Sequence, residues 1–95
     1  MIRREADRYL VEGTVTLDTV AGLLTEGLRI FEGKRPVVDF SGAHAADSSA
    51  LSLMLEWQRQ LKREGRDIAF TRVGANLVSL THLYGIADLI PIGAE

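Results

Sequence analysis

The apolar residues of this chain follow strand spacing in some segments and helical spacing in others. Residues 1–5 and 9–16 are rich in β-favouring side chains and are predicted to be extended, with Gly13 marking a bulge or bend. The spacing then becomes helical, and this helix is expected to end near Gly33, before Pro36. The apolar stripe of this first helix comprises Val20, Leu24, Leu28 and Phe31, and Leu23 and Ile30 widen it.

The second half of the chain repeats the alternation of strand and helix. A short apolar run at 36–40 predicts a buried strand, and the small residues of 41–46 predict an accessible loop. A helix is expected over 48–64, followed by an extended segment at 67–71 and a last helix over 75–84.

This order of elements predicts the fold class. Strand, strand, helix, strand, helix, strand, helix indicates an α/β fold with right-handed crossovers and parallel pairing in the centre of the sheet. We therefore expect a single domain over residues 1–95, in which a mixed sheet of about four strands carries three helices and an antiparallel first pair covers one edge.

Two stripes run along the helix predicted at 48–64. The one expected to face the core comprises Leu51, Met54, Leu55, Gln58 and Leu61. The other lies about a quarter turn away and comprises Ser49, Leu53, Trp57 and Gln60. Leu53 and Trp57 either flank the core or, because tryptophan is favoured as an interface anchor, belong to a partner-binding surface.

Composition and charge exclude several classes of function. The 13 acidic and 11 basic residues are spread along the chain, so the basic patch that nucleic-acid binding requires is missing. The apolar runs are far shorter than the roughly 20 residues of a membrane helix. No signal-peptide pattern opens the chain, and we expect a cytoplasmic protein that does not insert into a membrane.

The residues do not suggest catalysis or metal binding. Cysteine is absent, which rules out disulfides and thiolate metal sites. The two histidines, His44 and His82, lie far apart and have no carboxylates at metal-ligand spacing. We therefore expect no enzymatic activity, no metal and no cofactor, and group His44 with the partner-binding residues.

The sequence Asp47-Ser48-Ser49 stands out because it opens the helix at 48–64 directly after a predicted central strand. Asp47 or Ser48 is expected to cap this helix, since both residue types are favoured there. Binding surfaces of open α/β sheets lie at the carboxyl ends of the strands. A partner surface is therefore predicted over Asp47, Ser48, Ser49, Leu53 and Trp57, and a phosphoryl group on Ser48 would both suit the helix start and disturb that interface.

These segments resemble a known family, the STAS domains of bacterial anti-anti-sigma factors and of sulfate transporters. The likeness rests on residues 11–15 and 37–42 and on Asp47-Ser48-Ser49-Ala50-Leu51, which looks like the family's phosphorylation-loop signature. In that signature the residue after the aspartate is the phosphoacceptor. The resemblance thus implies a STAS fold and makes Ser48 the candidate acceptor.

Within that family, residues 51–57, 80–86 and 88–91 are most similar to MlaB-type STAS domains. These are subunits of an ABC transporter that moves phospholipids between the inner and outer membranes of Gram-negative bacteria and maintains outer-membrane lipid asymmetry. The similarity implies a non-catalytic cytoplasmic subunit that is held at the inner membrane by its partner. It would bind and support the transporter's ATPase through the start of the 48–64 helix and the neighbouring first helix.

The alternative is an anti-anti-sigma factor that binds an anti-sigma kinase and is switched by phosphorylation of Ser48. Many anti-anti-sigma factors have glycine after the two serines of the signature, whereas this chain has Ala50. The difference disfavours the alternative, and it makes Ser48 a stronger candidate for a contact residue than for a phosphorylation site.

Overall fold

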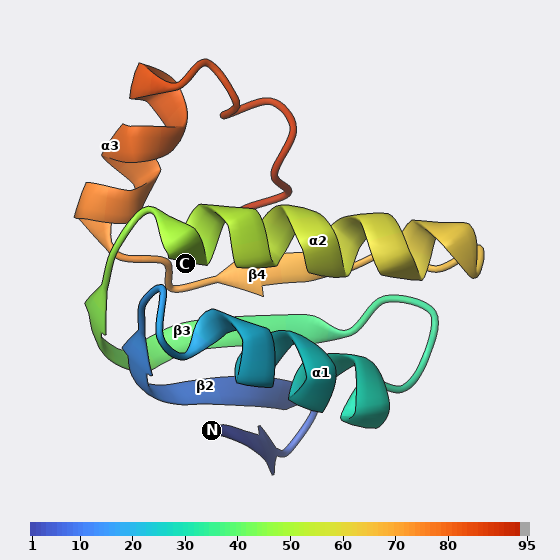
Figure 1. The fold of residues 1–95 in the computed structure, drawn as a ribbon. Coiled ribbons are helices and arrows are strands. Elements are labelled where there is room, and N and C mark those ends of the chain that lie inside the picture. The colour runs from blue at the N-terminus through green and yellow to red at the C-terminus, as the bar shows by residue number, and fades with distance from the viewer. Residues whose placement is uncertain (94–95) are drawn as a thin grey trace.

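A computed structural model describes residues 1–93, and its helices and strands follow the predicted order (Figure 1). The strands are β1 (Ile2–Glu5), β2 (Arg8–Val15), β3 (Val37–Ala46) and β4 (Ala69–Thr71). The helices are α1 (Val20–Ile30), α2 (Ser49–Arg63) and α3 (Ala75–Leu83). The predicted α/β fold and its order of elements are thereby confirmed.

The strands form one mixed sheet in the order β1, β2, β3, β4. As predicted, β1 and β2 are antiparallel, while β2 with β3 and β3 with β4 are parallel. Parallel neighbours need crossover connections, and α1 and α2 supply them. These two helices lie side by side over one face of the sheet, whereas α3 stands apart beyond the end of β4 (Figure 1).

The core lies between the sheet and these two helices, and the indole of Trp57 occupies its centre. Trp57 is 0% exposed, with the ring of Phe31 edge-on at 5.1 Å and that of Phe70 stacked at 6.4 Å between centroids. The indole N–H donates to the Leu24 carbonyl at 3.2 Å. A Cβ at Gly27 would lie 2.6 Å from the indole Nε1, so α1 packs this closely against α2 only because Gly27 has no side chain.

β3 continues through residues 41–46, where the sequence predicted a loop, and that prediction is wrong. β2 stays paired with β3 as far as Val15 opposite Ala46, so the sheet ladder holds these small residues extended. The register between the two strands shifts twice along this stretch. Gly13, with φ of +93°, lies at the second shift, which confirms the predicted bulge.

The buried side of α2 also differs from the predicted core stripe. Leu55 and Gln58 are only partly buried, whereas Leu53 and Trp57 from the other stripe are buried. The reason is that α2 packs on both the sheet and α1, so its buried sector is wider than a single stripe. The buried residues of α2 are Ala50, Leu51, Leu53, Met54, Trp57 and Leu61.

On the sheet face opposite α1 and α2, the buried carboxylate of Asp39 ties β2 to β3. It accepts hydrogen bonds from the Arg8 guanidinium at 3.2 Å and from the Ser41 N–H at 2.8 Å, and the Arg72 Nε lies 3.8 Å away. Burial alone raises the pKa of Asp39, but the hydrogen bonds from Ser41 and Arg8 outweigh it and leave that pKa below its ordinary value. Asp39 is therefore ionised at neutral pH and paired.

Candidate functional site

Asp47 and Ser48 form the turn between β3 and α2. The Asp47 N–H donates to the Val15 carbonyl at 3.1 Å, so the turn begins where the chain is still bonded to β2. The Asp47 Oδ1 accepts a hydrogen bond from the Ser49 N–H at 2.8 Å, which satisfies one of the unpaired N–H groups of the first helical turn. Ser48 is exposed and makes no side-chain cap bond, so its hydroxyl is accessible.

The surroundings of Asp47 keep its carboxylate charged at neutral pH. The hydrogen bond from the Ser49 N–H lowers the pKa of Asp47, and the backbone N–H of Leu17 lowers it further. Leu17 lies in the turn between β2 and α1, and it is 77% exposed. The Asp47 carboxylate therefore lies beside the backbone of the turn that carries the exposed Leu17, and the accessible Ser48 hydroxyl follows it in the chain.

A shallow groove of about 460 Å³ runs between α1 and α2. Its floor is apolar, and its rim carries the salt bridge between Glu56 and Arg59 at 2.7 Å. Hydrogen bonds from Arg59 and Gln60 lower the pKa of Glu56 and keep it ionised at neutral pH. The groove is lined by Val20, Ala21, Leu24, Ser52, Leu53, Glu56 and Arg59.

The structure separates the residues that the sequence placed on one partner surface. Asp47, Ser48 and Ser49 lie together at the helix start, and the edge of Leu53 reaches the groove floor although Leu53 is only 3% exposed. The prediction that Trp57 faces a partner is wrong, because its indole fills the space between α1 and the sheet.

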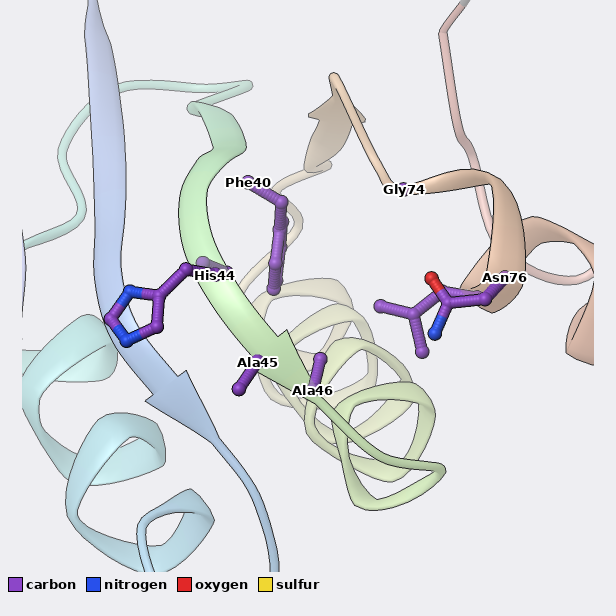
Figure 2. Close-up of a pocket in the computed structure, with 8 residues that line it drawn as sticks. Phe40, His44, Ala45, Ala46, Gly74 and Asn76 are labelled. Atoms are coloured by element: carbon purple, nitrogen blue, oxygen red, sulfur yellow. The ribbon is translucent and has the colours of Figure 1, made fainter.

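His44 lies in β3 at the second register shift, where it has no opposite residue in β2. Its ring lies on the β2 side of the strand (Figure 2). On the other side a second hollow, lined in part by Phe40 and Asn76, separates β3 from the first turn of α3 (Figure 2). His44 is exposed and belongs to the end of β3 rather than to the groove between the helices.

Sequence reasoning missed Leu17, and it expected the first helix to contribute only through the family resemblance, without naming residues of that helix. Val20 and Leu24 belong to the apolar stripe predicted for the first helix; both are partly buried and line the groove. Leu17 does not recur with other apolar residues at strand or helical spacing. The sequence pattern therefore predicted it neither as a core residue nor as a surface residue. Only the pairing of β2 with β3 brings its turn next to Asp47.

None of the helices within residues 1–93 is long and apolar enough to cross a membrane. Over the same residues, no group of three or more histidine, aspartate or glutamate side chains converges as metal ligands do.

Comparison with known proteins identifies the family. No curated protein matches the chain. A solved structure from Thermotoga maritima, assigned as an anti-sigma factor antagonist, superposes with a TM-score of 0.77 over 100% of this chain and 85% of that one, at 11% identity, which shows a shared fold. A family model described as "Mlab, STAS domain" matches residues 2–91. Because that match spans nearly the whole sequence, the chain belongs to the STAS domain family.

Proposed function

We propose that this STAS domain is a non-catalytic, cytoplasmic subunit that binds and supports the ATPase of an ABC transporter. The transporter moves phospholipids between the inner and outer membranes and maintains outer-membrane lipid asymmetry. The domain is held at the inner membrane through this ATPase, and it takes no part in ATP hydrolysis itself.

The observation that carries this proposal is an exposed turn before α2 together with an apolar groove beside that helix, in a chain whose family model is described as Mlab. We call the two together the α1–α2 surface and define it by Leu17, Asp47, Ser48 and the groove between α1 and α2. It combines an exposed apolar side chain, an apolar floor and charged rims. That composition, an apolar centre with a polar rim, is typical of protein interfaces.

A second candidate is an anti-anti-sigma factor that binds an anti-sigma kinase. It is supported by the structural likeness to an anti-sigma factor antagonist and by the exposed hydroxyl of Ser48 at a helix start. There a phosphoryl dianion would be stabilised by the helix dipole, but it would lie close to the Asp47 carboxylate. Ala50 in place of the glycine of many anti-anti-sigma factors favours the transporter subunit.

Capture of partners from the native cell separates the two candidates. The chain, tagged and expressed at its natural level, is purified gently and its partners are identified by mass spectrometry. We expect an ABC-type ATPase and its permease. Recovery of a histidine-kinase-like ATPase, with no ABC-type ATPase, would overturn the proposal in favour of the anti-sigma pathway.

A pair of surface variants tests whether the α1–α2 surface makes the contact. Leu17→Asp places a charge where an apolar anchor is expected to be buried, and should weaken ATPase binding at least about tenfold. Leu83→Asp is the matched control, because Leu83 is 74% exposed, close to the 77% of Leu17, but lies at the end of α3. Equal binding by both variants would show that the ATPase binds elsewhere.

A further inference from the structure

Among residues 1–93, the second half of β3 has a neighbouring strand on only one side. β4 pairs with β3 at three positions and ends at Thr71 opposite Asp39, whereas β2 remains paired as far as Ala46. Directly after Thr71, Arg72 adopts φ of +54°, which is uncommon for residues other than glycine, and the chain leaves the sheet toward α3. Within residues 1–93, no strand therefore lies beside β3 on that edge from Phe40 onward.

This edge presents backbone groups that are suited to pair with another strand. The Asp47 N–H donates to the Val15 carbonyl, and successive residues of a strand direct their N–H and C=O groups to alternate sides. Ala46 therefore directs its N–H and C=O away from β2, toward the side without a strand. Such exposed peptide groups on a strand edge form a template for an added strand.

The space beside this edge is hollow, and no lysine, arginine, aspartate or glutamate lines it. A hollow of about 310 Å³ lies between the end of β3 and the first turn of α3 (Figure 2). Phe40 and Leu77 border it but are themselves buried, and the amide of Asn76 extends from α3 toward it (Figure 2). Alanine and glycine supply most of the remaining lining, which leaves the backbone of β3 accessible. The lining residues are Phe40, Ala43, His44, Ala45, Ala46, Gly74, Asn76 and Leu77.

We propose that a short, extended and uncharged peptide segment of the partner ATPase binds in this hollow by adding a strand to the free edge of β3. The inference rests on the proposed function and extends it to a second contact. Strand addition supplies affinity through main-chain hydrogen bonds and specificity through side-chain pockets. Here the outward-facing peptide groups of Ala46 would bond to the added strand, and the Asn76 amide can pair with a peptide group of it.

The position of the edge favours the ATPase as the source of this segment. β3 ends at Ala46, and the next two residues, Asp47 and Ser48, belong to the α1–α2 surface. An ATPase docked on that surface would therefore lie at the mouth of the hollow. One extended segment from it would reach the β3 edge without crossing the rest of the domain.

Hydrogen exchange of the chain alone and in its complex with the ATPase tests the inference. Amides of residues 43–46 that point away from β2 should exchange at least about tenfold more slowly in the complex, because the added strand bonds them. Slower exchange confined to the α1–α2 surface would overturn the inference and leave the proposed function intact. Failure of the ATPase to bind at all would overturn both. Slower exchange in the concentrated chain alone would assign the edge to a second copy of the chain and overturn the inference.

Two tryptophan variants on α3 provide an independent readout. Asn76→Trp places a large side chain at the hollow from an exposed position, and should weaken ATPase binding about tenfold and abolish the slower exchange of residues 43–46. Ser79→Trp is the control, because Ser79 is exposed on the same helix and does not line the hollow. Binding of Asn76→Trp as tight as that of Ser79→Trp would contradict strand addition. Both variants are first checked for an unchanged urea unfolding midpoint.

Discussion

The beginning and the middle of α2 lie on one helix but have opposite environments. At the beginning, Asp47 and Ser48 are exposed, and the Ser48 hydroxyl makes no side-chain cap bond. In the middle, Trp57 is 0% exposed and contacts the ring of Phe31, directly after α1, and the ring of Phe70 in β4. The exposed turn and the buried turn of α2 are thus different parts of the helix, so mutations should separate the proposed binding from stability.

The largest expected effect is on stability, from Trp57→Ala in the middle of the helix. Removing the indole leaves a cavity between α1 and the sheet, and should lower the free energy of unfolding by about 3–5 kcal/mol. That is a large part of the roughly 5–15 kcal/mol typical of a whole domain. Urea denaturation measures it, with exposed Arg59→Ala as a control expected to stay within about 0.5 kcal/mol of the parent. A loss below about 1 kcal/mol would contradict the core assignment.

A pair of glycine substitutions in α1 tests the contact that buries Trp57. A Cβ at Gly27 would lie 2.6–2.8 Å from indole atoms, so Gly27→Ala should cost about 1–3 kcal/mol despite the higher helix propensity of alanine. Gly22→Ala on the same helix meets no atom within 4 Å and should stabilise by about 0.5–1 kcal/mol. Thermal or urea unfolding of the two variants should therefore shift in opposite directions.

The beginning of the helix should respond in binding and not in stability. Ser48→Asp adds a charge to the α1–α2 surface, and is expected to weaken ATPase binding about tenfold while changing the unfolding free energy by less than about 0.5 kcal/mol. Isothermal titration and urea denaturation of the same preparation measure the two quantities. Ser79→Asp on α3 is the control and should bind like the parent. A large stability loss in Ser48→Asp would show that this turn also belongs to the structural framework.

The smallest expected effect is a pH dependence at Asp47. Its pKa is lowered in the folded chain, so the carboxylate stabilises the helix start at pH values above the ordinary pKa of an aspartate. This contribution is lost as the pH falls through the lowered, folded-state pKa. Asp47→Ala should therefore be slightly less stable than the parent at neutral pH, and the difference should shrink in acid.

Asp47→Asn sharpens this measurement, because its amide oxygen keeps an acceptor for the Ser49 N–H without the charge. Its stability difference from the parent should be smaller than that of Asp47→Ala at neutral pH. Urea midpoints measured between neutral and strongly acidic pH decide the point. A difference for Asp47→Ala that is constant over this range would assign the cap to a group that does not titrate.

The sequence was sufficient to predict the order of strands and helices, because local spacing and turn residues are recorded in it. Helical spacing began near Val20, and the bulge at Gly13 was marked by glycine itself. The helix start at Asp47 and Ser48 was likewise predictable, since capping depends on residue type and on neighbours along the chain.

The candidate site was only half predictable for the same reason. Its α2 half, around Asp47, Ser48 and Ser49, is local in sequence. Its other half, Leu17 and the α1 side of the groove, is adjacent only because β2 pairs with β3. The assignment of Trp57 stayed open in the sequence, because helical spacing shows that a face is apolar but does not show what covers it.

The sequence by itself therefore determined the α/β order, the family likeness and the exposed serine at a helix start. The tertiary structure decided the rest. It placed residues 41–46 in a strand, because pairing with β2 satisfies backbone N–H and C=O groups whatever the side chains are. It buried Trp57 because Gly27, far away in sequence, leaves room for the indole. And, within residues 1–93, it left β3 without a neighbouring strand on one edge from Phe40 onward, because β4 ends after three residues.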